Sequence, residues 1–73
     1  MRINNYMIIE GTTEIPVKDI EDHEFDNYTG TIFLSVPGGL AVIENKNFDI
    51  AFRNYQAITD AIQHYNVHNM CLN

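Results

Sequence analysis

The sequence predicts a small α+β domain, in which an antiparallel β-sheet is covered on one face by a C-terminal α-helix. Two observations carry this prediction. Apolar, β-branched runs flank a Pro-Gly-Gly turn at 37–39, which is the pattern of a β-hairpin over 31–36 and 40–45. Beyond Asn47 the apolar residues recur at helical spacing. The strands therefore come first along the chain and one helix comes last.

The N-terminal part of the chain reads as two further strands of this sheet. Residues 4–11 (NNYMIIEG) place apolar side chains alternately on opposite faces, and the final glycine stops the run. Residues 13–20 (TEIPVKDI) alternate Ile15 and Val17 with polar residues and a proline. Because Pro16 has no N–H to donate to a neighbouring strand, we expect this second strand at an edge of the sheet.

The arms of the predicted hairpin are apolar on nearly every residue, and only Thr31 and Ser35 interrupt the first arm. This pattern indicates burial on both faces, by the helix on one side and by a second subunit on the other. A chain of 73 residues also has a small core, with roughly 3–5 kcal/mol of net stability. Its one cysteine excludes an internal disulfide. Together these features predict a homodimer.

The helix is predicted over about residues 49–65, a length of about 25 Å. Asn47 or Asp49 can cap its first N–H groups. The stripe expected to face the sheet consists of Phe48, Ala51, Phe52, Tyr55, Ile58, Ala61, Ile62 and Tyr65.

Composition narrows the class of protein. We expect a single domain over 1–73. Ten acidic residues against four basic ones give a formal net charge of −6, which disfavours direct nucleic-acid binding and favours a basic partner. No run approaches the ~18 apolar residues of a membrane span, and the N-terminus lacks the pattern of a signal peptide. With the single cysteine, these features predict a cytoplasmic protein.

Half of the acidic residues fall in one segment, DIEDHEFD at 19–26. In an extended backbone, Asp22, Glu24 and Asp26 would share one face at a spacing of about 6.5 Å. Such a row of negative charges resembles a nucleic-acid backbone to a protein that binds one. We expect the charged contacts to a partner to be Asp19, Glu21, Asp22, Glu24 and Asp26, with Phe25 and Tyr28 as aromatic anchors.

Other interpretations of this segment stay open. The acids could belong to a solvated edge strand whose charges prevent edge-to-edge pairing. A calcium loop of the EF-hand type is excluded by spacing, because a loop that starts at Asp19 places Glu24 where glycine is required and Gly30 where glutamate is required. Catalysis has little support, since no nucleophile motif is present and 73 residues hardly enclose a cleft. We expect no enzyme activity and no cofactor.

A second group of metal-binding residue types lies at the C-terminus. His64 and His68 are one helical turn apart, and Cys71 follows three residues later. Imidazole and thiolate ligands at this spacing could hold zinc, with His23 as a fourth ligand. The local set is incomplete, so we expect polar residues of a terminal helix and no metal site.

In size, acidity and Asn/Ile-rich composition, and in the run DIEDHEFD, the chain resembles the small host-takeover inhibitors encoded by phages. Several of these mimic DNA and block sliding clamps, uracil-DNA glycosylase, restriction enzymes or CRISPR effectors. The Glu-Ser-Ile motif of the uracil-DNA glycosylase inhibitors is missing. The resemblance implies an inhibitor that occupies the nucleic-acid-binding site of a host DNA-processing protein in the host cytoplasm. The alternative is an immunity, antitoxin or virion accessory subunit without DNA mimicry.

Overall fold

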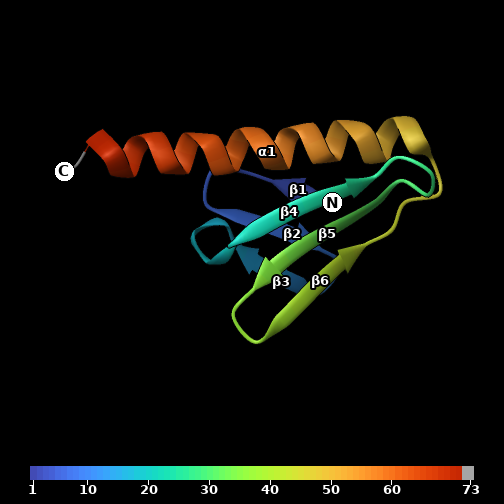
Figure 1. Ribbon diagram of the computed structural model, residues 1–73, viewed down its shortest axis with the longest axis horizontal. Coiled ribbons are helices and arrows are strands. Elements are labelled where there is room, and N and C mark those ends of the chain that lie inside the picture. The colour runs from blue at the N-terminus through green and yellow to red at the C-terminus, as the bar shows by residue number, and fades with distance from the viewer. Residues whose placement is uncertain (72–73) are drawn as a thin grey trace.

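The computed structural model describes the backbone of residues 1–71 and the side chains of residues 1–67. This part of the chain forms six strands, one 3₁₀ helix and one long α-helix (Figure 1). In chain order they are β1 (Arg2–Ile3), β2 (Met7–Glu10), β3 (Thr13–Pro16), η1 (Val17–Asp19), β4 (Asp22–Asp26), β5 (Thr31–Val36), β6 (Gly39–Ile43) and α1 (Phe48–Cys71). All strand pairs are antiparallel. The α+β class predicted from the sequence is confirmed.

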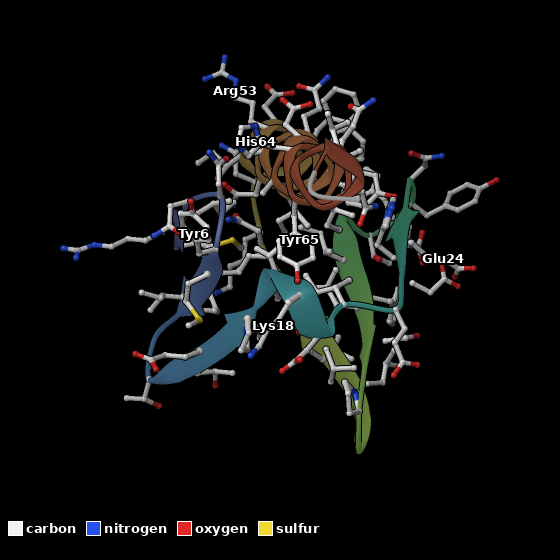
Figure 2. The ribbon with its side chains drawn as sticks, turned by 90° about the vertical axis from the view of Figure 1, so that its left-hand side faces the viewer. Tyr6, Lys18, Glu24, Arg53, His64 and Tyr65 are labelled. Carbon is white, nitrogen blue, oxygen red and sulfur yellow. The ribbon has the colours of Figure 1, made fainter. Side chains whose placement is uncertain are left out.

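The strands divide into two three-stranded sheets, with the orders β1-β2-β3 and β4-β5-β6, where the sequence predicted a single sheet. Figure 2 shows the two sheets on opposite sides beneath α1. The division begins at η1, because residues 13–20 do not continue as one strand. β3 ends at Pro16, and the buried Val17 starts a 3₁₀ turn. This turn carries the chain from the first sheet to the second.

The edge position predicted from Pro16 is confirmed, since β3 is an outer strand of the first sheet. Glu10 and Thr13 flank the two-residue turn between β2 and β3 and therefore form a hydrogen-bonded pair. Hydrogen-bonded pairs alternate along the two strands, so Pro16, opposite Met7, falls where an N–H would point away from β2. The missing N–H of the proline costs no hydrogen bond at this position.

The predicted hairpin is confirmed as β5 and β6, and its second arm covers 39–43 where the sequence indicated 40–45. Gly38 has a φ of 92°, the conformation required of the second turn residue after a proline. Within the described residues, the hairpin is buried on one face only. On one face Ile32 and Leu34 are at most 1% exposed, whereas Leu40 on the other face is 56% exposed. No other element of the described chain covers that second face.

The predicted helix is also confirmed, and it extends at both ends beyond the predicted 49–65. Asn47 caps it, because its side-chain oxygen accepts a hydrogen bond from the Ile50 N–H at 3.2 Å. Figure 2 shows Tyr65 pointing from α1 into the space between the two sheets. The core lies in this space and consists of Ile8, Ile15, Val17, Ile32, Leu34, Ile43, Ile58 and Ala61.

Gly30 determines how closely the turn between β4 and β5 approaches α1. Its φ of 74° lies in the left-handed region, which residues with a Cβ rarely adopt. It is buried, and a Cβ added there would lie 3.3 Å from the Cβ of Ala51 in the first turn of the helix. The absence of a side chain at this position therefore allows β4 and α1 to pack together.

Candidate partner-binding face

Strand β4 presents alternate side chains to opposite faces, as the sequence predicted for an extended segment. Asp22 and Glu24 are exposed, whereas His23 and Phe25 are half-buried. Figure 2 shows Glu24 pointing away from α1 and from the first sheet. Successive residues on one face of a strand are about 6.5–7 Å apart. Asp22 and Glu24 therefore form a short acidic row on the solvent side of the second sheet.

The other three acidic residues that the sequence predicted as partner contacts do not continue this row. Asp19 is the last residue of η1 and is half-buried. Glu21 is exposed in the link before β4, and its N–H donates a hydrogen bond to the Ser35 carbonyl at 2.8 Å. Asp26 is half-buried at the end of β4. The structure thus brings together Asp22, Glu24 and the adjoining Glu21, and places Asp19 off the strand.

Two of the carboxylates also bind their own backbone. Asp22 Oδ1 accepts a hydrogen bond from the His23 N–H at 2.8 Å. Asp26 Oδ1 accepts hydrogen bonds from the N–H groups of Tyr28 at 2.8 Å and Thr29 at 3.4 Å, which closes the turn between β4 and β5. Asp26 is therefore a turn-forming residue. Asp22 satisfies a donor on an outer strand, which is the role expected of a charged edge residue.

Phe25 is not on the acidic face. Its ring packs between β4 and α1, with centroid distances of 5.6 Å to Phe48, 5.9 Å to Phe52 and 5.1 Å to Tyr55. Residues 23 and 25 turn toward the helix because the helix supplies the aromatic stripe that covers them. Phe25 is therefore a packing residue. A docking anchor beside Asp22 would have to lie on the opposite face of β4.

Tyr28 is placed as an anchor would require. It lies in the turn between β4 and β5 and is 98% exposed. Its N–H is held by Asp26, so the backbone is fixed while the ring projects into solvent. An exposed aromatic ring on an ordered backbone loses little conformational entropy when a partner covers it.

Sequence reasoning missed the apolar half of this surface. The strand register aligns Asp22 with Ser35 and Leu40, and Glu24 with Phe33 and Val42. We call the six side chains in these two rows the outer face: Asp22, Glu24, Phe33, Ser35, Leu40 and Val42. Leu40 is 56% and Val42 is 49% exposed. The alternation of the hairpin arms contains this signal, but their high apolar content predicts burial on both faces and so hides it.

The outer face has a shallow hollow of about 260 Å³, lined by Asp22, His23, Glu24, Phe33, Ser35 and Leu40. The lining thus combines two acidic residues with the apolar residues Phe33 and Leu40. No basic side chain belongs to the outer face. The outer face can bind a partner surface that carries both positive charge and apolar side chains, because its own acidic and apolar side chains lie next to each other.

Of the three C-terminal residues considered as zinc ligands, His64 lies exposed on α1. The side chains of His68 and Cys71 lie outside the described part of the chain. Among the described residues, no group of three or more His, Cys, Asp or Glu side chains is placed to hold a metal ion. His23 is engaged elsewhere, since its Nδ1 lies 2.7 Å from the Tyr55 hydroxyl oxygen.

Within the described part of the chain, no helix is both long enough and apolar enough to cross a membrane. Comparisons with models of protein families, with curated proteins and with solved structures found no match to this chain.

Proposed function

We propose that this protein is an inhibitor that binds another protein through the outer face and occupies the nucleic-acid-binding site of a DNA-processing protein. The observation that carries the proposal is the pairing of exposed carboxylates with exposed apolar side chains in the same two rows of one sheet. Nucleic-acid-binding sites are basic, and they accept phosphates at regular spacing. Asp22 and Glu24 offer negative charge at strand spacing, and the chain as a whole carries −6.

The apolar side chains supply what charge alone does not. Charge complementarity chiefly raises the rate of association, while buried aromatic and aliphatic contacts slow dissociation. Phe33, Leu40 and Val42 adjoin the acidic row, and Tyr28 projects from the nearby turn. The proposal involves no catalytic step. It is consistent with the resemblance in size and composition to phage-encoded inhibitors.

A second candidate function is favoured by the same apolar side chains. In this case the protein is an interaction subunit, such as an immunity protein, antitoxin or virion accessory protein, and the acids serve to keep the edge of β4 from pairing. The hydrogen bond from the His23 N–H to Asp22 supports that role for one acid. The two candidates differ in the physical nature of the contact, which is electrostatic in the first and apolar in the second.

The test is a capture experiment with three forms of the protein on a solid support. They are the parent, the double variant Asp22→Asn/Glu24→Gln, and the double variant Leu40→Ser/Val42→Thr. Bound proteins from a low-GC bacterial lysate are challenged with salt and with short duplex DNA. The inhibitor proposal expects a partner that both salt and DNA release, and that the charge variant fails to retain.

The opposite pattern would favour the second candidate. A partner that withstands salt and DNA, stays bound to the charge variant and is lost with the apolar variant would show an apolar docking surface. Retention by both variants would show that the outer face is not the binding surface.

A homodimer also belongs to the proposal. No element of the described residues covers the outer face, and Leu40 and Val42 supply exposed apolar area there. A second copy on this face would add buried area to a domain of only 73 residues. Binding of a basic partner would then compete with self-association.

A further inference from the structure

The two sheets leave an opening between their outer strands β3 and β6. These strands lie on the side of the molecule farthest from α1 (Figure 1), and they do not pair with each other. A groove of about 470 Å³ runs between β3 and the tip of the hairpin, lined by Thr13, Glu14, Ile15, Pro16, Asp19, Val36, Pro37, Gly38, Gly39, Leu40 and Ala41. A second hollow of about 210 Å³ lies between Glu10, Thr13, Ile15, Ala41, Val42 and Ile43. We call the two together the seam.

The register of the hairpin shows which backbone groups of β6 face the seam. Val36 and Gly39 flank a two-residue turn and form a hydrogen-bonded pair. The pairs alternate from there, so Ala41 and Ile43 bond to β5. The N–H and C=O groups of Leu40 and Val42 therefore point away from β5, along the open side of the strand. β6 offers two donors and two acceptors at the spacing that an added strand requires.

The other side of the seam is formed by β3. By the same alternation, Thr13 and Ile15 bond to β2, and the backbone groups of Glu14 point outward. Pro16 has only a carbonyl to offer. β6 contains no proline and no charged residue, whereas on β4 the His23 N–H is already held by Asp22. Strand β6 is thus the edge of the second sheet best suited to pair with another chain.

The side chains around the seam define what could pair there. Ile15, Ala41 and Ile43 point toward the core and form its apolar floor. Glu10, Glu14 and Asp19 line it as well, and no lysine or arginine is among the lining residues. An occupant therefore needs an extended backbone, apolar side chains at alternate positions and positive charge at its ends.

We propose that the seam binds an extended, basic segment of a partner protein as an added β-strand along β6. The main chain of Leu40 and Val42 provides the hydrogen bonds, and the acidic residues of the rim select lysine or arginine. This inference does not rest on the function proposed for the outer face, because it uses the backbone edge of β6 and the opposite side of the sheet. The two surfaces meet at Leu40 and Val42, which contribute side chains to the outer face and main-chain groups to the seam.

The test is an amide NMR titration of the ¹⁵N-labelled protein with a defined probe, the blocked peptide Lys-Val-Thr-Val-Thr-Val-Lys. The control peptide replaces both lysines by glutamate. We expect the lysine peptide to shift the amide signals of Glu14, Leu40 and Val42, and to slow the hydrogen exchange of Leu40 and Val42, whose N–H groups it engages, at least tenfold. We expect the glutamate peptide to bind at least tenfold more weakly.

Two further probes examine the backbone pairing itself. A lysine peptide with N-methyl groups on alternate residues cannot donate along one edge, and we expect it to lose binding. The variant Val42→Pro removes one outward N–H, as Pro16 does on β3, and we expect weaker binding with dispersed NMR signals. If that variant does not fold, the N-methylated peptide gives the same information on the unaltered protein.

Four outcomes would overturn the inference. The lysine peptide could leave the seam signals unchanged at millimolar concentration, or it could shift outer-face signals such as those of Glu24 and Phe33 instead. The glutamate peptide could bind as well as the lysine peptide. The Glu14 signal could also depend on protein concentration before any peptide is added, which would identify a second copy of this chain as the occupant, because Glu14 lines the seam and lies outside the outer face.

Discussion

The Nδ1 atom of His23 lies 2.7 Å from the hydroxyl oxygen of Tyr55, which joins the edge of the second sheet to the middle of α1. The two rings are also in contact in a tilted arrangement, with a centroid distance of 5.6 Å and an interplanar angle of 56°. This contact links residues that are 32 positions apart. It sits beside the Phe25 cluster, so one side of β4 is fixed to the helix while the other side stays in solvent.

Tyr55→Phe is expected to lower the free energy of unfolding by about 0.5–1.5 kcal/mol. The substitution removes the hydroxyl that pairs with His23 and keeps the ring packed on Phe25. Urea unfolding followed by circular dichroism measures the change. Tyr6→Phe serves as the matched control, since Tyr6 is 71% exposed and its hydroxyl loss should be silent. Equal stability of the two variants would show that the His23–Tyr55 bond contributes nothing.

Phe25→Leu is expected to destabilise the domain by about 1–2 kcal/mol, because it removes ring contacts and leaves space beneath Phe48 and Phe52. Partner binding by the folded fraction should stay unchanged, as the side chain lies behind the acidic face. Thermal unfolding gives the first quantity, and titration calorimetry with a captured partner gives the second. If the variant loses affinity while its stability is unchanged, Phe25 contacts the partner directly, as the sequence predicted.

Asp26→Ala is expected to lower stability by about 0.5–2 kcal/mol, since two N–H groups of the turn lose their acceptor. Asp60→Ala on α1 is the control. Asp60 is exposed, and its removal should change the unfolding free energy by less than about 0.5 kcal/mol. The difference between the two urea midpoints checks the assignment of Asp26 as a turn residue. No difference between them would argue that its carboxylate is free for other contacts.

Asp22→Asn/Glu24→Gln is expected to weaken binding to a basic partner tenfold or more, which corresponds to about 1.4 kcal/mol. The fold should persist, because exposed charges contribute less than about 1 kcal/mol each. Affinity measured at two salt concentrations separates charge from packing: the parent should lose affinity with salt, and the variant should lose less. Asp60→Asn should bind like the parent. If the variant keeps the affinity and the salt dependence of the parent, the two acids do not contact the partner and serve only to keep the edge of β4 from pairing with another strand.

Leu40→Ser/Val42→Thr is expected to shift the protein from dimer to monomer in sedimentation equilibrium at micromolar concentration. The exchange removes apolar area from the outer face and leaves the core residues of β6 in place. Circular dichroism should show an unchanged helix content. A parent protein that sediments as a monomer under the same conditions would exclude the homodimer.

Sequence reasoning was most successful where one local rule decides the structure. The Pro-Gly turn specifies the hairpin, helical spacing specifies α1, and the missing N–H of Pro16 specifies an outer strand. The division into two sheets was not predictable in the same way. Residues 13–20 alternate like a single strand, and the turn at Val17 depends on a pocket formed by residues from other elements.

The candidate site was predicted in part for a related reason. Alternation along β4 correctly separates Asp22 and Glu24 from Phe25. It does not say which face meets solvent, because that depends on the aromatic stripe of a helix that begins more than 20 residues later. The apolar half of the outer face was overlooked because Leu40 and Val42 have the same composition as core residues, and their exposure depends on what the rest of the chain leaves uncovered.

Because Gly30 lies close to Ala51, a substitution at either position changes which residues the other position can tolerate. A side chain at position 30 would meet the Ala51 Cβ at 3.3 Å, so any enlargement at one position moves the first turn of α1 and with it Phe48. A smaller residue at position 51 relieves the clash but not the backbone conformation of position 30. Substitutions here are therefore non-additive, and among descendants of this sequence glycine at position 30 should be retained while position 51 drifts only among the smallest residues.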